Sequence, residues 1–236
     1  MSISLKRARA IFVKDYKEFS RNYAISIMLI FPILLAFLYR GLGISSIGVF
    51  GFLLNFLFAF LTSFVQACLI AEEKERNTLR SLMMTPATAM DVLIGKSALV
   101  FVMSAVVLAI VTYIFGYEPV SIWTFVATII LSIILYSAVG TICGLFSKTV
   151  LETSLFIIPV EAVFLAAPFG VLLAKDFPIF KVLEYVPSSQ LVYLLGTSNI
   201  GFTTGDLLKP FLITLIWTVV LTIVSVVLYK RRLKDE

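Results

Sequence analysis

The sequence contains no histidine and only two cysteines. Without histidine the chain lacks the commonest zinc and haem ligand, so neither kind of site is expected, and we predict no metal site. Cys68 and Cys143 both lie in apolar stretches, where each is expected to pack as a small hydrophobe rather than form a disulfide. The sequence also offers no set of residues that we interpret as catalytic.

Charge is scarce as well. Only 14% of the 236 residues are charged and 60% are hydrophobic, which gives a mean hydropathy of +1.05. A soluble domain of this size cannot hide so much apolar surface. Uncharged apolar stretches of about 18 residues or more recur along the chain, so the sequence predicts an integral membrane protein.

Six such stretches predict six transmembrane helices in an all-α fold. At ~1.5 Å per residue, each is long enough to cross a hydrocarbon layer of ~30 Å. The chain shows no internal repeat, low-complexity segment or flexible linker, so residues 1–236 are expected to form one membrane domain. The predicted spans are Asn22–Tyr39, Val49–Ala71, Val92–Tyr117, Val120–Ser147, Thr153–Ala174 and Pro210–Tyr229.

Residues 1–21 precede the first span and are too charged to cross the membrane. Apolar residues recur there at helical spacing, with basic residues over much of the remaining surface, which predicts an amphipathic helix in the cytoplasmic interface. An ordinary cytoplasmic tail is the alternative. The expected apolar face consists of Leu5, Ala8, Phe12, Tyr16 and Phe19.

Lysine and arginine predict the orientation. With six spans, 15 of these residues fall on one side and four on the other: Arg40, Lys175, Lys181 and Lys209. The positive-inside rule therefore places both termini in the cytoplasm. Residues 175–209 form the largest outer segment, in which Pro187–Leu195, followed by Gly196, is expected to be a short helix at the outer interface or dipping partway into the membrane.

Residues 72–91 form a charged cytoplasmic loop between the second and third spans. We expect the second span to continue as a helix from Glu72 to Arg80 and to end at Thr85-Pro86. A capping box, Thr88 with Asp91, then starts the third span. Exposed charges beside a small apolar ridge suit docking to a partner protein, although any short loop between spans needs polar residues.

The stretch Ala71–Lys96 resembles the segment after the second span in permeases of type-2 ABC exporters. Positions that match are Thr78, Leu79, Leu82, Thr85, Pro86, Gly95 and Lys96. The resemblance implies a half-transporter that pairs with itself or a related permease. It further implies that a separate ABC ATPase subunit binds ATP and Mg, and that this chain is a transport subunit rather than an enzyme.

The same resemblance assigns the loop to contact with the ATPase. The residues expected to couple to it are Glu72, Glu73, Glu75, Arg76, Leu79, Arg80, Leu82 and Met83. It also implies outward movement of an amphipathic or hydrophobic cargo, such as a peptide, bacteriocin or other antimicrobial, or a drug, across a bacterial plasma membrane.

Glu161 is the one acidic or basic residue that we place well inside a predicted span. Such a residue is costly in lipid, so it must face protein or water. We expect it to line the translocation pathway or a subunit interface, or to be protonated or hydrogen-bonded in a structural role. Pro159 and Pro168 flank it and are expected to kink the helix.

Two further motifs have structural interpretations. Gly140 and Gly144 permit close helix packing, more readily within one chain than between two. Gly95-Lys96-Ser97 imitates the end of a phosphate-binding loop, but Met90 stands where that loop needs glycine, so this chain is not expected to bind ATP.

Two other functions stay open. An ion-coupled carrier would work without an ATPase, although it predicts inverted repeats and more buried ionisable groups than we see. An intramembrane enzyme would need a catalytic pair on facing spans, and Glu161 has no such acidic partner in the sequence.

Overall fold

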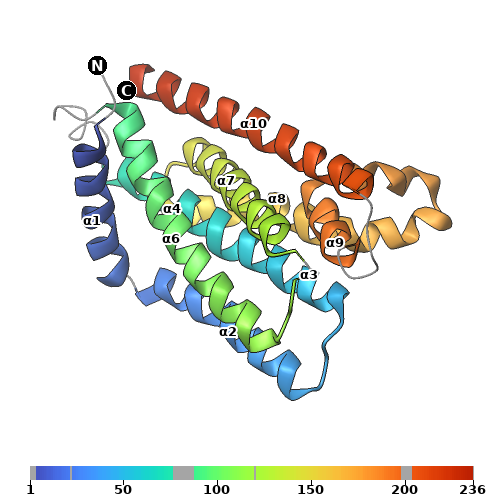
Figure 1. Ribbon diagram of the computed structural model, residues 1–236. Coiled ribbons are helices and arrows are strands. Elements are labelled where there is room, and N and C mark those ends of the chain that lie inside the picture. The colour runs from blue at the N-terminus through green and yellow to red at the C-terminus, as the bar shows by residue number, and fades with distance from the viewer. Residues whose placement is uncertain (1–3, 22, 77–87, 120, 198–203, 236) are drawn as a thin grey trace.

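The computed structural model describes residues 4–21, 23–76, 88–119, 121–197 and 204–235. Within these ranges the chain is helical and contains no strand, which confirms the predicted all-α fold (Figure 1). The α-helices are α1 (Leu5–Arg21), α2 (Tyr23–Gly41), α3 (Ile47–Phe56), α4 (Phe64–Glu75), α6 (Ala89–Phe115), α7 (Ile122–Phe146), α8 (Val150–Leu172), α9 (Pro187–Thr197) and α10 (Thr204–Asp235).

Five helices in the described part of the chain are long and apolar enough to cross a membrane. They indicate a membrane protein, and they match the second to sixth predicted spans. The first predicted span corresponds to α2, whose described apolar stretch, Ile27–Gly41, is shorter. The count of six therefore stays a prediction. The five segments are Ile47–Glu75, Met90–Phe115, Ile122–Phe146, Val150–Lys175 and Leu207–Arg232.

Helix α7 and the segment Ile47–Glu75 form the centre of the bundle. In their most apolar stretches, 72% of α7 and 61% of Ile47–Glu75 are buried, against 17% for α8 and for α10. Figure 1 shows α7 between α4 and α10, and it packs against both. The two outer helices leave large apolar side chains such as Leu155 and Ile216 exposed, as lipid-facing helices do.

A π-helical turn, Leu57–Ser63, joins α3 to α4 within one continuous helix. Each backbone bond in such a turn spans five residues instead of four, which accommodates an additional residue in the helix. Phe56 and Phe64, on either side of the turn, keep ordinary α-helical backbone angles. The two halves of this central helix therefore present differently rotated faces to their neighbours.

Two glycines bring α7 close to this central helix. A Cβ atom added at Gly140 would lie 2.2 Å from the carbonyl oxygen of Ser63, and one at Gly144 would lie 2.6 Å from that of Ala67. Both distances are far below van der Waals contact, so only glycine fits without a shift of backbone. The contact lies between helices of the same chain.

Local sequence patterns are seen at both ends of α6, and the predicted capping box at its start is confirmed. Thr88 and Asp91 form a capping box, with each side chain accepting a hydrogen bond from the other residue's backbone N–H. Gly116 ends α6 in the left-handed conformation, with φ of 77°, which is readily accessible to glycine. Pro159 and Pro168 both lie inside α8, which runs as one helix from Val150 to Leu172.

The described end of α4 is earlier than predicted. The helix ends at Glu75, with Arg76 as its C-cap, rather than continuing to Arg80. The remainder of the expected docking segment, residues 77–87, lies outside the described residues and includes Leu79, Arg80, Leu82 and Met83.

Helix α1 is amphipathic, and its buried face overlaps the predicted apolar face in part: Ala8 and Phe19 belong to both, and Phe12 is half-buried. The buried residues are Ala8, Ile11, Asp15 and Phe19, whereas Leu5 and Tyr16 are exposed. The predicted face grouped residues by hydrophobicity, and α1 instead packs along α6 with a buried aspartate in the contact. A lipid-interface position for α1 is not tested by these contacts.

Helix α9 extends past Gly196 to Thr197, so this glycine does not lie beyond the helix as predicted. The helix packs against α3, α8 and α10, and the carbonyl oxygen of Ser188 accepts a hydrogen bond from Asn55 at 3.2 Å. Two 3-10 helices, Leu173–Lys175 and Pro178–Tyr185, connect α8 to it. Most of α9 is buried among its neighbours.

The first and last helices reach the same end of the bundle. In Figure 1 the marked N- and C-termini lie together there, and a small apolar cluster joins the helix ends. Its buried members are Ile11, Ile70, Val92, Leu93, Leu145 and Tyr229, from α1, α4, α6, α7 and α10. We refer to this end, where α4 ends and α6 begins, as the α4–α6 end.

Adding one methyl group at Gly140 tests the close packing of α7 on the central helix. We expect Gly140→Ala to destabilise the protein by about 1–3 kcal/mol, because the new Cβ meets backbone that cannot rotate away. The thermal midpoint in detergent should fall. Gly48→Ala is the matched control, since a Cβ there meets nothing within 4 Å. Equal midpoints for the two variants would contradict this packing.

Candidate functional site

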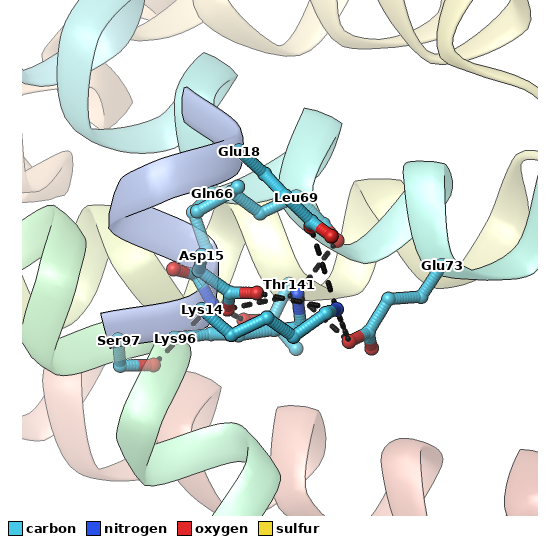
Figure 2. Close-up of polar contacts among 9 residues, drawn as sticks. All are labelled: Lys14, Asp15, Glu18, Gln66, Leu69, Glu73, Lys96, Ser97 and Thr141. Atoms are coloured by element: carbon cyan, nitrogen blue, oxygen red, sulfur yellow. Dashed lines mark hydrogen bonds and ion pairs between the residues drawn. The ribbon is translucent and has the colours of Figure 1, made fainter. Parts of the chain in front are cut away.

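A buried cluster of charges lies at the α4–α6 end (Figure 2). The ammonium of Lys96, on α6, lies 3.1 Å from a carboxylate oxygen of Asp15 and 3.1 Å from one of Glu73. It also donates to the carbonyl oxygen of Leu69 at 3.0 Å. Only 1% of the Lys96 side chain is exposed, so these contacts replace the water that a charge of this kind normally keeps.

Lys14 closes the cluster from the more exposed side. Its ammonium lies 3.6 Å from Asp15, 3.4 Å from Glu18 and 3.7 Å from Glu73. Partial burial disfavours its charged form, but the three carboxylates outweigh this effect and raise the pKa of Lys14. Lys14 and Lys96 thus balance the two buried carboxylates, Asp15 and Glu73.

Helix α1 is held on α6 by two further contacts. Asp91 accepts hydrogen bonds from the guanidinium of Arg7 and from the backbone N–H of Ser4, both at 2.8 Å. Gly95 lets the helices approach, because a Cβ there would lie 2.8 Å from the carbonyl oxygen of Ala8. The close backbone contact at Gly95 thus lies between two polar contacts, Arg7 with Asp91 and Asp15 with Lys96, and together they fix α1 relative to α6.

The last turn of α4 contacts four other helices through three consecutive residues. Glu73 contacts Lys96 of α6 and Lys14 of α1. The ammonium of Lys74 donates to the carbonyl oxygens of Leu145, at 2.8 Å, and Ser147, at the end of α7. Glu75 accepts a hydrogen bond from the backbone N–H of Val150, the first residue of α8, at 2.9 Å.

Polar side chains continue from the cluster into the bundle along α4. The amide nitrogen of Gln66 donates to the hydroxyls of Thr141, at 3.0 Å, and Ser97, at 3.3 Å (Figure 2). Further along, the hydroxyls of Thr62 and Ser104 are 2.8 Å apart. Hydrogen bonds thus link the central helix to α6 and α7 over about three turns.

Glu161 faces protein, as its cost in lipid requires. Its side chain is 2% exposed, although α8 as a whole is largely exposed. Among the described residues, neither carboxylate oxygen has a hydrogen-bond partner. This carboxyl group is therefore buried without the paired cations that surround Glu73.

The structure separates the predicted coupling residues. Glu72 and Arg76 form an ion pair at 2.6 Å along the helix, and Glu75 is exposed. Glu73 is not an exposed charge: it is 3% exposed, because it turns inward to pair with Lys96. Its coupling role stays a prediction. Pro159 and Pro168 lie in α8 on either side of Glu161, and Pro168 lines a cavity of 490 Å³ together with residues of α9 and α10.

Sequence reasoning missed Asp15 and Lys74, and it treated Lys96 only as a position of the exporter-like motif and of the imitated phosphate-binding loop. Asp15 was open to detection, because Ala8, Ile11, Asp15 and Phe19 follow helical spacing and an acidic residue interrupts that stripe. A buried aspartate on one helix and a buried lysine on another, here Asp15 and Lys96, would have suggested an ion pair.

No protein-family model matches the chain, and no curated protein matches it. The function therefore has to be argued from the geometry of the chain itself.

Lys96→Met should destabilise the protein by about 3–5 kcal/mol, because it leaves Asp15 and Glu73 as buried carboxylates without their central cation. The thermal midpoint in detergent measures this loss. Lys148→Met, at an exposed lysine, is the matched control and should change it little.

A triple variant that removes the charges of Lys96, Asp15 and Glu73 distinguishes the effect of lost charge balance on stability from the effect of lost packing. Combining Lys96→Met with Asp15→Asn and Glu73→Gln should recover much of the stability, since no uncompensated charge then remains. A triple variant no more stable than Lys96→Met alone would contradict the role of charge balance.

Proposed function

We propose that this chain is the membrane-spanning permease subunit of an ATP-driven ABC exporter, with a separate cytoplasmic ATPase subunit. The observation that carries the proposal is the last turn of α4. Glu73, Lys74 and Glu75 contact α6 and α1, α7, and α8 respectively. The charged segment with the exporter-like motif follows this turn directly in the sequence.

This arrangement suits the transmission of force. A partner that binds residues 77–87 would pull or push on the end of α4, and consecutive side chains would pass that displacement to four helices. Buried ion pairs and a lysine bound to two carbonyl oxygens are stiffer links than apolar contacts alone, because they specify direction as well as distance. In this proposal α1 moves with α6, to which it is held at Asp91 and Lys96.

The proposed topology has six spans, with α2 as the first, α1 at the cytoplasmic interface and both termini in the cytoplasm. The distribution of lysine and arginine supports it. In this orientation the α4–α6 end is cytoplasmic, and α9 lies toward the outer side. The exporter would contain two permeases, identical or related, in a bacterial plasma membrane.

The proposed cargo is amphipathic or hydrophobic: a peptide, a bacteriocin or other antimicrobial, or a drug. Glu161 is the residue best suited to meet a cationic group on such a cargo, because its carboxyl group is buried and unpartnered within the described residues. The same observation supports the rival function, an ion-coupled carrier in which Glu161 binds the coupling ion. An intramembrane enzyme has no comparable support.

Co-expression with ABC ATPases encoded near its gene tests the exporter. A matching ATPase should co-purify with this chain and hydrolyse ATP in lipid discs. Leu79→Asp combined with Leu82→Asp should reduce co-purification several-fold, because these substitutions place charge on the predicted apolar ridge. Lys148→Asp changes charge in the other proposed cytoplasmic loop and should leave the complex intact.

Lys74→Met tests transmission separately from docking. It removes the contact with the end of α7 but leaves the docking segment unchanged, so the complex should form while hydrolysis is no longer stimulated by assembly. Thermal stability of the purified chain identifies any variant that fails to fold.

Two results would contradict the exporter. One is the absence of a complex with any candidate ATPase, and the other is transport into vesicles that proceeds without ATP and follows an ion gradient. Loss of that gradient-driven transport in Glu161→Gln would favour the ion-coupled carrier.

A further inference from the structure

A long groove opens on the side of the bundle between α2, α6 and α7. Its volume is 920 Å³, at the upper end of the ~300–1,000 Å³ typical of sites for small organic molecules. The wall is apolar along most of its length. Representative lining residues are Phe101, Leu108 and Ala109 of α6 and Phe125, Ile129 and Ile133 of α7.

The groove is elongated because two helical stripes form its walls. On α6 the lining runs from Phe101 to Ile114, a distance of roughly 20 Å at the helical rise, and on α7 it runs from Ile122 to Ile133. One leaflet of a bilayer contributes about half of its ~30 Å hydrocarbon core. The groove therefore matches the length of an extended acyl chain better than that of a compact ligand.

Two opposite charges stand at one end of the groove. Arg40, in the last turn of α2, donates a hydrogen bond to the carbonyl oxygen of Ile114 near the end of α6. Glu118 lines the same end, and both residues are exposed. A guanidinium has five N–H donors, so one bond to a carbonyl leaves donors for a phosphate.

Aromatic residues mark the level of this end in the membrane. Tyr113 is 85% exposed and Trp123 is 82% exposed, on the facing ends of α6 and α7. Exposed tyrosine and tryptophan are enriched where hydrocarbon meets the headgroup layer. The charged end of the groove thus lies where a phospholipid places its phosphate, and the apolar length lies where its acyl chain runs.

We propose that this groove binds one zwitterionic phospholipid, with its phosphate on Arg40, its ammonium beside Glu118 and an acyl chain between α6 and α7. The inference depends on the chain being a membrane protein and not on the exporter. A second copy of the chain fits less well, because a helix laid into the groove would bury Arg40 and Glu118 without supplying a phosphate and an ammonium together.

The probe is phosphatidylethanolamine with a photoreactive diazirine in one acyl chain, presented to the full-length protein in lipid discs. Cross-linked peptides identify the site, and competition with unlabelled lipid gives relative affinity. Cross-links are expected in Phe101–Ile133. Unlabelled phosphatidylethanolamine should compete well, and diacylglycerol, which lacks the phosphate, should compete poorly.

Three variants separate the parts of the site. Arg40→Gln should weaken competition by phospholipids by about tenfold, as expected for loss of a charge-assisted hydrogen bond. Glu118→Gln should reduce the preference for phosphatidylethanolamine over phosphatidylglycerol, which has no ammonium. Ala109→Trp should block the apolar length and remove the cross-links. Lys175→Gln, at another exposed cation, should leave labelling unchanged.

Several outcomes would overturn the proposal. They are equal competition by diacylglycerol, equal labelling of the Arg40→Gln and Lys175→Gln variants, or cross-links confined to other helices. Cross-links between two copies of the chain at α6 and α7 would assign the groove to a dimer contact instead. If Arg40 served only to cap α6, Arg40→Gln would lower the thermal midpoint without changing the ranking of competing lipids.

Discussion

The ion cluster around Lys96 is the constraint on which the rest of the structure depends. A lysine this deeply buried is tolerated only where carboxylates and carbonyl oxygens surround it, and its partners Asp15, Leu69 and Glu73 belong to α1 and α4. Since three helices each supply a required group, none can slide or rotate alone without leaving a charge unpaired. The cluster thus fixes the positions of α1, α4 and α6 far more narrowly than apolar packing would.

Close backbone contacts complete this framework. Gly95 allows α1 to approach α6, and Gly140 and Gly144 allow α7 to approach the central helix. Small residues have this role in membrane proteins because lipid offers little hydrophobic drive for helices to associate.

Glu161 differs from the buried charges of the ion cluster. It is as deeply buried as Glu73, yet the described residues offer it no hydrogen bond, so its carboxyl group is the one whose interaction the fold leaves open.

Local patterns predicted the helices well and their arrangement poorly. The capping box at Thr88 depends on neighbouring residues, so it could be predicted. Hydropathy cannot separate the central α7, 72% buried, from the peripheral α10, 17% buried, because lipid and protein interior are both apolar. The pairing of Lys96 with Asp15 joins residues 81 positions apart. Nothing in a single sequence connects them, and grouping by hydrophobicity left Asp15 out of the expected contact face of α1.

The π-helical turn at Leu57–Ser63 has a consequence for how this protein can diverge. A helix rotates by about 100° per residue, so one insertion or deletion between Phe64 and Gln66, after the turn, would turn every later side chain by that angle. Gln66 would leave Ser97 and Thr141, and Glu73 would leave Lys96. The number of residues after the turn is therefore constrained as strictly as the identity of the polar side chains there. Within the turn itself, one residue can be lost without this rotation, because the turn then becomes α-helical. In an alignment of homologues we expect gaps to be absent from residues 64–75, even where substitutions are frequent, and any one-residue gap to fall within Leu57–Ser63.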